Sequence, residues 1–175
     1  MPELRVKAFE RGENSIEYII EHNLQHAKDV ITKDINGTSE FSPTLFIITK
    51  DTMFYILLDT KMAQETRCSP LDQVAPMLDI FRENKMGTIL TYQVIGEAWM
   101  KKMSTETEGL EKLRYGDISK MAGRVEVLMQ VVGDNKGIKF TTFEMKREVD
   151  SDKILQFKEM DTSEGNIETG KFPIL

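Results

Sequence analysis

Three glutamates in the second half of the sequence are spaced so that folding could bring their carboxylates together. Glu126 and Glu144 each lie in a segment that alternates apolar and polar residues, and Glu97 lies in a third. If the two later segments pair as a hairpin, Glu126 falls opposite Glu144, and Glu97 or Asp59 supplies a third oxygen ligand. Close carboxylates can hold a divalent cation, or separate their pKa values into an acid and a base, as a small metal-dependent hydrolase requires.

The pairing of those two segments rests on the alternation of their side chains. A three-residue loop, Asp134–Lys136, places Val127 opposite Phe143, so that apolar partners share one face and charged partners the other. Arg124 and Lys146 then lie on the charged face beside the glutamates. Because these cations neutralise the carboxylates, a solvated, salt-bridged surface is the favoured interpretation, and the catalytic site is the alternative.

The two histidines of the chain offer a second candidate for chemistry. His22 and His26 have the i, i+4 spacing of the zinc-binding His-Glu-x-x-His motif, and Asp29 continues the same edge of the expected helix. Asn23 stands where the motif carries its catalytic glutamate, so hydrolysis by that motif is excluded. A structural metal site is the alternative to the favoured interpretation, in which both histidines are polar flanks of an exposed helix face.

Cys68 is the single cysteine, and one thiol forms neither an internal disulfide nor a cysteine-based zinc site. It precedes Ser69-Pro70, a typical cap and first position of a helix, where a thiol can be acidified. No histidine lies near it in the sequence to activate it, which favours a plain loop residue. The sequence also lacks the phosphate-binding, nucleophile and calcium-loop motifs of common enzyme families, so no cofactor is expected.

Residues typical of protein interfaces gather around one long polar segment. Trp99 and Met100 end a strand-like segment, and Met103 follows within the polar stretch 101–121. Aromatic residues and methionine are enriched where proteins bind one another, although the 11 methionines of the chain also suit an irregular core. A loop of this length is long for a compact domain and indicates a function of its own. Trp99, Met100 and Met103 are therefore the predicted interface residues.

The elements that must position these residues follow from hydrophobic spacing. Apolar residues three and four apart predict a helix over residues 14–32, and a cap followed by proline predicts a second over 69–85. Strands are expected at 44–48, 53–59, 88–100, 124–132 and 138–148, with 153–160 as a candidate edge strand. The order α-β-β-α-β-β-β predicts a single α+β domain over residues 1–160, a mainly antiparallel sheet of about five strands with two helices packed on one face. Residues 161–175 are expected to form a C-terminal tail that docks through its last apolar residues.

Composition narrows the class of protein further. The chain has 175 residues, of which 40% are hydrophobic, and a formal net charge of -6 at pH 7. Nucleic acids are bound through a basic excess, so this acidic chain is expected to have no nucleic-acid partner. No apolar run reaches the ~18 residues of a membrane-spanning helix, so no membrane partner is expected either. The segment Met1–Lys7 lacks the apolar stretch of a signal peptide, which indicates a cytoplasmic protein.

Three segments resemble a family of uncharacterised prokaryotic and phage-associated proteins that carry a Glu-Ala-Trp strand followed by an Arg-x-Glu-x-Leu strand. They are Gly96–Met100 (GEAWM), Arg124–Met129 (RVEVLM) and Phe143–Arg147 (FEMKR). The resemblance extends over about half of the chain and implies no known activity. The order of elements is also similar to that of roadblock and profilin-like domains, which act as dimerising scaffolds.

Two functions are consistent with these observations. Missing catalytic motifs, unpaired strand edges and the methionine content favour a non-enzymatic binding or assembly module, either a homo-oligomer or the binder of a protein partner. The alternative is a small metal-dependent hydrolase that uses Glu97, Glu126 and Glu144.

Overall fold

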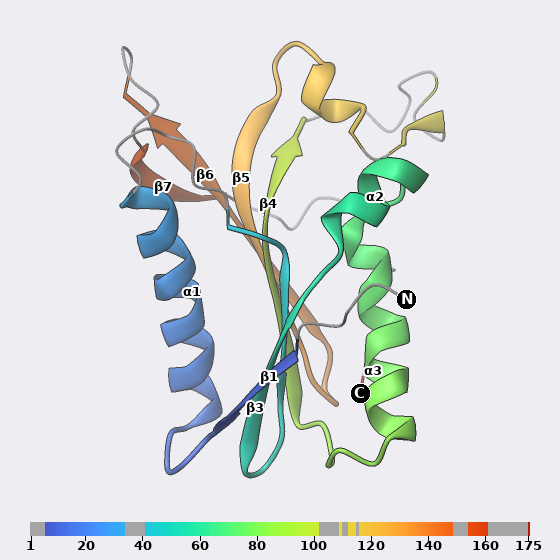
Figure 1. Ribbon diagram of the computed structural model, residues 1–175. Coiled ribbons are helices and arrows are strands. Elements are labelled where there is room, and N and C mark those ends of the chain that lie inside the picture. Colours follow the sequence, from blue (N-terminus) through green and yellow to red (C-terminus); the bar gives the residue numbers. More distant parts are fainter. Residues whose placement is uncertain are drawn as a thin grey trace.

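A computed structural model describes residues 6–33, 41–101, 109, 112–114, 116–148, 154–160 and 175. Within them, seven antiparallel strands form one sheet in the order β1-β3-β2-β4-β5-β6-β7 (Figure 1). The strands are Val6–Glu10 (β1), Thr44–Ile48 (β2), Thr52–Leu57 (β3), Thr91–Met100 (β4), Val125–Gly133 (β5), Ile138–Arg147 (β6) and Ile154–Met160 (β7). The helices are Ile16–Thr32 (α1), Thr60–Thr66 (α2) and Val74–Glu83 (α3), with 3-10 turns at Pro70–Gln73 (η1) and Ile118–Lys120 (η3). The α+β class is confirmed, although the sheet has seven strands rather than about five, and β1 and α2 were not expected.

The helices cover both faces of the sheet, so the expectation that they share one face is wrong. α1 lies on one side of the strands and α3 on the other (Figure 1). Phe46 and Leu128 belong to the core beneath α1, whereas Leu45 and Ile47 belong to the core beneath α3. All five residues of β2 are buried, because an unbroken apolar strand needs cover on both faces. We name the two sides of the sheet the α1 face and the α3 face.

The β5–β6 hairpin differs by one residue from the predicted register. Leu128 pairs with Phe143, and Val127 pairs with Glu144. The loop between the strands has four residues instead of three, and the Asp134 carboxylate closes it by accepting two backbone N–H groups. Since successive side chains point to opposite faces, this slip places Val127 and Phe143 on different faces. The alternation was ambiguous because both faces of β5 are covered by helices.

The buried side of α1 contains a polar residue at its centre. The residues that face the sheet are Ile19, Asn23, Ala27 and Ile31. Asn23 Nδ2 donates to Gln93 Oε1 at 3.0 Å, and Gln93 Nε2 donates to Gln130 Oε1 at 2.7 Å and to the Ile20 carbonyl at 2.9 Å. These amides satisfy one another, so polar side chains are accommodated between the helix and the sheet.

The second predicted helix is divided into η1 and α3. Ser69 caps η1 as expected, because its hydroxyl accepts the Leu71 N–H at 3.2 Å. α3 then begins at Val74, which places Pro76 in its first turn. A backbone N–H in the first turn has no partner within the helix, so proline is tolerated there.

The last residue, Leu175, packs against the core beneath α3, and its N–H donates to the Asp134 carbonyl at 3.1 Å. This contact agrees with the expectation that the C-terminal residues dock on the domain. Residues 161–174 of the predicted tail lie outside the described residues. In the part of the chain that the structure describes, no helix is long and apolar enough to cross a membrane.

Candidate functional site

The structure separates the three glutamates that the sequence grouped together. Glu97 and Glu126 lie on the α1 face with Leu128, whereas Glu144 pairs with Val127 and points to the α3 face. Among the described residues, no three histidine, cysteine or acidic side chains lie close enough to hold a metal ion. The sheet therefore does not bring these glutamates into one carboxylate site.

Each candidate carboxylate accepts hydrogen bonds within the fold. The donors are the Phe41 N–H to Glu97 Oε2 (2.7 Å), Arg147 to both oxygens of Glu126 (2.6 and 2.7 Å), Lys146 Nζ to Glu144 Oε1 (2.7 Å) and the Met62 N–H to Asp59 Oδ1 (2.9 Å). Asp59 is thereby the N-cap of α2. Through these contacts the carboxylates connect strands and loops and cap the start of α2.

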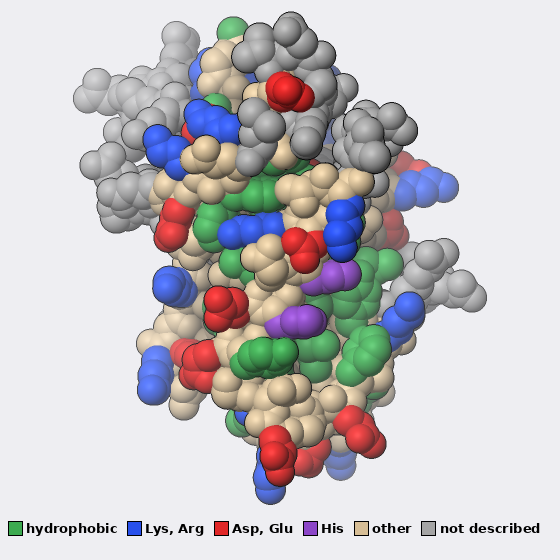
Figure 2. Space-filling view, turned by 90° about the vertical axis from the view of Figure 1, so that its left-hand side faces the viewer, with side chains coloured by type: hydrophobic (Ala, Val, Ile, Leu, Met, Phe, Trp, Pro, Cys, Tyr) green, Lys and Arg blue, Asp and Glu red, His purple; other side chains and the backbone are tan. Residues whose placement is uncertain are grey.

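The histidines lie on the outward side of α1. His22 and His26 are both exposed, and Figure 2 shows them on one face of the molecule, with both hydrophobic and charged side chains around them. His22 stacks on Tyr18 with a centroid distance of 5.9 Å, and Asp29 accepts a hydrogen bond from Gln25 at 3.0 Å. This arrangement agrees with the interpretation of both histidines as polar residues of an exposed helix face.

Trp99 is the one exposed residue of β4, with 42% of its surface accessible. It lies directly opposite Glu126, and the Arg124 guanidinium lies 4.9 Å from the centre of its ring. Arg124 also donates to the Met121 carbonyl at 3.0 Å, and Arg147 holds Glu126 through two N–H groups. We name the four side chains Trp99, Arg124, Glu126 and Arg147 the tryptophan patch.

The other two predicted interface residues do not join this patch. Met100 is half-buried, and as the neighbour of Trp99 in the strand it points to the α3 face. Met103 lies outside the described residues. Of the three predicted interface residues, the structure thus places Trp99 at the surface beside Arg124, which the sequence analysis did not select, although aromatic and arginine residues together are typical of binding surfaces.

The described part of the 101–121 segment is tied to α2. Arg67, the C-cap of α2, forms an ion pair with Asp117, and the Arg114 N–H donates to Asp117 Oδ2 at 2.8 Å. The hydrogen bond from the Arg114 N–H and, to a smaller extent, the positive charge of Arg67 hold the pKa of Asp117 below its usual value. The segment then continues through η3 to Met121, which receives the Arg124 hydrogen bond.

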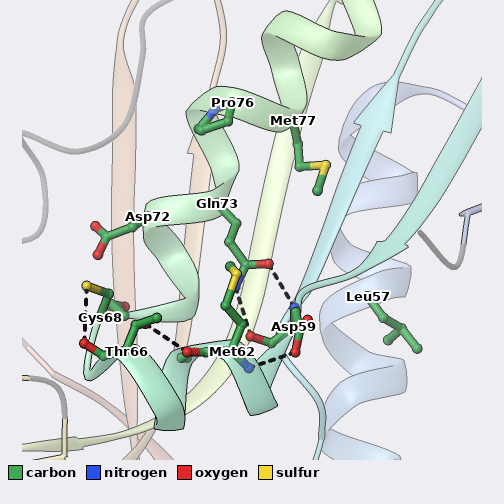
Figure 3. Close-up of a pocket in the computed structure, with 11 residues that line it drawn as sticks. Leu57, Asp59, Met62, Thr66, Cys68, Asp72, Gln73, Pro76 and Met77 are labelled. Carbon is green, nitrogen blue, oxygen red and sulfur yellow. Dashed lines mark hydrogen bonds between the residues drawn. The ribbon is translucent and has the colours of Figure 1, made fainter. Parts of the chain in front are cut away.

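An open cavity of about 280 Å³ lies between α2, η1 and α3 (Figure 3). It is lined by Leu57, Asp59, Met62, Ala63, Thr66, Cys68, Ser69, Asp72, Gln73, Pro76 and Met77. Gln73 of η1 is joined to Asp59, the N-cap of α2, across this cavity. The Gln73 side chain accepts the Asp59 N–H at 2.8 Å and donates to the Asp59 carbonyl at 2.9 Å. The exposed Cys68 has its Sγ 3.7 Å from the Thr66 carbonyl. A lining with two carboxylates and no basic side chain disfavours anionic ligands.

Comparison with protein-family models, with curated proteins and with solved structures finds no match to this chain. No family is assigned. The resemblance of the segments 96–100, 124–129 and 143–147 to uncharacterised prokaryotic proteins therefore stays a prediction, as does the analogy with dimerising scaffolds.

Proposed function

We propose that the chain is a cytoplasmic, non-enzymatic protein-binding module and that the tryptophan patch holds its partner. The observation that carries this proposal is the half-exposed indole of Trp99, which lies on a strand with the Arg124 guanidinium 4.9 Å from the centre of its ring. Tryptophan and arginine account for much of the binding energy of protein interfaces, because each buries a large surface and offers directional hydrogen bonds.

The rigidity of the patch supports the same proposal. The backbone of Trp99 belongs to β4, a hydrogen bond to the Met121 carbonyl holds Arg124, and two N–H···O bonds join Arg147 to Glu126. Side chains that are already fixed lose little conformational freedom on binding, so more of the contact energy contributes to affinity. A patch that is ordered before binding is suited to a partner of defined shape.

The test compares two exposed aromatic residues. Wild-type, Trp99→Ala and Tyr18→Ala chains are immobilised and incubated with a lysate of the native host, and bound proteins are quantified by mass spectrometry. We expect at least one protein to be retained by the wild type and by Tyr18→Ala but lost from Trp99→Ala. The purified partner should then bind Trp99→Ala at least about 30-fold more weakly, as for an interface residue worth 2 kcal/mol. Equal retention by all three chains would contradict the proposal.

A further inference from the structure

The strand β1 is the least covered strand of the described sheet. All five of its residues are exposed, with Phe9 at 50% and Val6 at 38%. Among the described residues it pairs with β3 alone, so its second edge ends the described sheet (Figure 1). We infer that this edge pairs with β1 of a second copy of the chain, antiparallel and centred on Ala8. This surface is separate from the tryptophan patch and does not depend on the function proposed for that patch.

The hydrogen bonding of β1 shows which backbone groups face outward. The Arg11 N–H donates to the Asp51 carbonyl at 2.8 Å, in line with the register that pairs Glu10 with Thr52. Hydrogen-bonded pairs alternate along an antiparallel ladder, so Phe9 and Lys7 also bond toward β3. The N–H and C=O groups of Val6, Ala8 and Glu10 therefore point to the open edge and can form an equivalent ladder.

One register satisfies these groups in a symmetric dimer. A twofold axis through Ala8 pairs Ala8 with Ala8, and Val6 with Glu10 of the second copy, so all three outward-facing residues form hydrogen-bonded pairs. Lys7 then lies opposite Phe9 of the second copy, where its aliphatic stem covers the ring. The two Phe9 rings are diagonal neighbours, within the reach of aromatic side chains.

The neighbouring symmetric registers are less favourable. Within Val6–Glu10, a shift of the axis to Lys7 places the two Lys7 side chains opposite each other, and a shift to Phe9 leaves Val6 beyond the end of the second copy's strand. Like charges directly opposite destabilise a strand pair, and only the Ala8-centred register avoids them while using all five residues.

The other edge of the sheet is less suited to pairing. β7 pairs with β6 through a register shift at Lys146/Arg147. Bulges next to an edge are a common protection against further strand addition. β1 carries no bulge in its pairing with β3 and no proline, so its backbone remains available as a template.

Sedimentation equilibrium of the purified chain tests the inference. The Ala8→Pro variant removes an N–H that faces the open edge and leaves the bonds to β3 in place, whereas Ala8→Ser is the matched control. We expect the wild type and Ala8→Ser to form a dimer, and Ala8→Pro to dimerise about tenfold more weakly or worse, because two symmetry-related hydrogen bonds are lost. A wild-type chain that is monomeric at its highest soluble concentration overturns the inference.

Disulfide trapping tests the register of the dimer. It also tests the inference if Ala8→Pro fails to fold. In a Cys68→Ser background, Ala8→Cys places the two Cα atoms about 5.5 Å apart, within the span of a disulfide. We expect oxidation to give a covalent dimer from Ala8→Cys, and none from Glu17→Cys on the exposed side of α1. Equal cross-linking of both variants contradicts the inference. Loss of the dimer in Trp99→Ala also contradicts it, since self-association would then run through the tryptophan patch.

Discussion

Gln93 Nε2 lies 2.7 Å from Gln130 Oε1, so two glutamine side chains on adjacent strands are hydrogen-bonded inside the protein. Gln93 also accepts from Asn23 and donates to the Ile20 carbonyl, and it thereby joins α1 to the middle of the sheet. The consequence is that one side chain of β4 satisfies polar groups of both α1 and β5.

Replacing Gln93 with leucine should lower the free energy of unfolding by about 3 kcal/mol, because the buried amides of Asn23 and Gln130 lose their partner. Gln130→Leu is the matched control. It should cost about 1 kcal/mol, since Gln93 keeps its other two hydrogen bonds. Urea unfolding followed by circular dichroism measures both values. Equal losses in the two variants would show that Gln93 does not have this central role.

Gly133 lies against the side chain of Tyr92, and a Cβ at this position would overlap two ring carbons and the hydroxyl oxygen of Tyr92. Tyr92 is fully buried, so the ring has no room to move away. We expect Gly133→Ala to destabilise the fold by about 3 kcal/mol, the upper range for overpacking. At Gly96 an added Cβ meets only Pro43 at 3.4 Å, so Gly96→Ala serves as the control and should cost much less. Thermal unfolding of the two variants provides the comparison.

Burial raises the pKa of Tyr92 to about 12. The folded chain therefore keeps a proton on this phenol that the unfolded chain releases near pH 10. The stabilisation from the neutral phenol is fully present below pH 10 and is lost as the pH rises through 12. Ultraviolet titration at the tyrosinate band should show one tyrosine ionising about two pH units after an ordinary one, and Tyr92→Phe should remove that late step. A titration curve unchanged by Tyr92→Phe would refute this assignment.

The pKa of Lys28 is lowered by burial, while the Glu159 carboxylate acts in the opposite direction. Its Nζ lies 4.0 Å from the centre of the Phe143 ring, which also favours the charged form. Because the folded chain binds the proton less tightly than the unfolded chain, stability from this group increases as the pH rises from the lowered pKa toward 10.5. NMR titration of the lysine side chains should find Lys28 below the other lysines, and Glu159→Gln should lower its pKa further. A rise in Glu159→Gln would contradict this account.

Divalent cations should not stabilise the protein, because Glu144 and Glu126 lie on opposite faces of the sheet. We expect millimolar Mg²⁺ or Mn²⁺ to leave the melting temperature unchanged in the wild type and in Glu126→Gln. A clear rise with Mn²⁺ that disappears in Glu126→Gln would instead support the hydrolase alternative. Calcium is a useful third ion, since it accepts less regular sets of oxygen ligands.

The sequence alone determined the local elements. The spacing of Ile19, Ala27 and Ile31 specifies α1, Ser69 specifies the start of η1, and the apolar run Leu45–Ile48 specifies a buried strand. The helix and the cap follow from contacts within one or two turns of the chain. The strand follows from its apolar composition, because an apolar segment must be buried by other elements. Trp99 was selected by its residue type alone, and the structure places it at the surface.

Only the tertiary structure decided how these elements meet. Val127 and Leu128 are both fully apolar and both buried, so alternation did not reveal which of them lies opposite Phe143. The second helix covers the face that a one-sided sheet would leave to water, and this removes the polar side that the register argument assumed. Strand pairing is set by loop length and by cover from distant segments, and neither is encoded within a single strand. For that reason Glu126 and Glu144 lie on opposite faces of the sheet, and β1 forms an open edge of the described sheet.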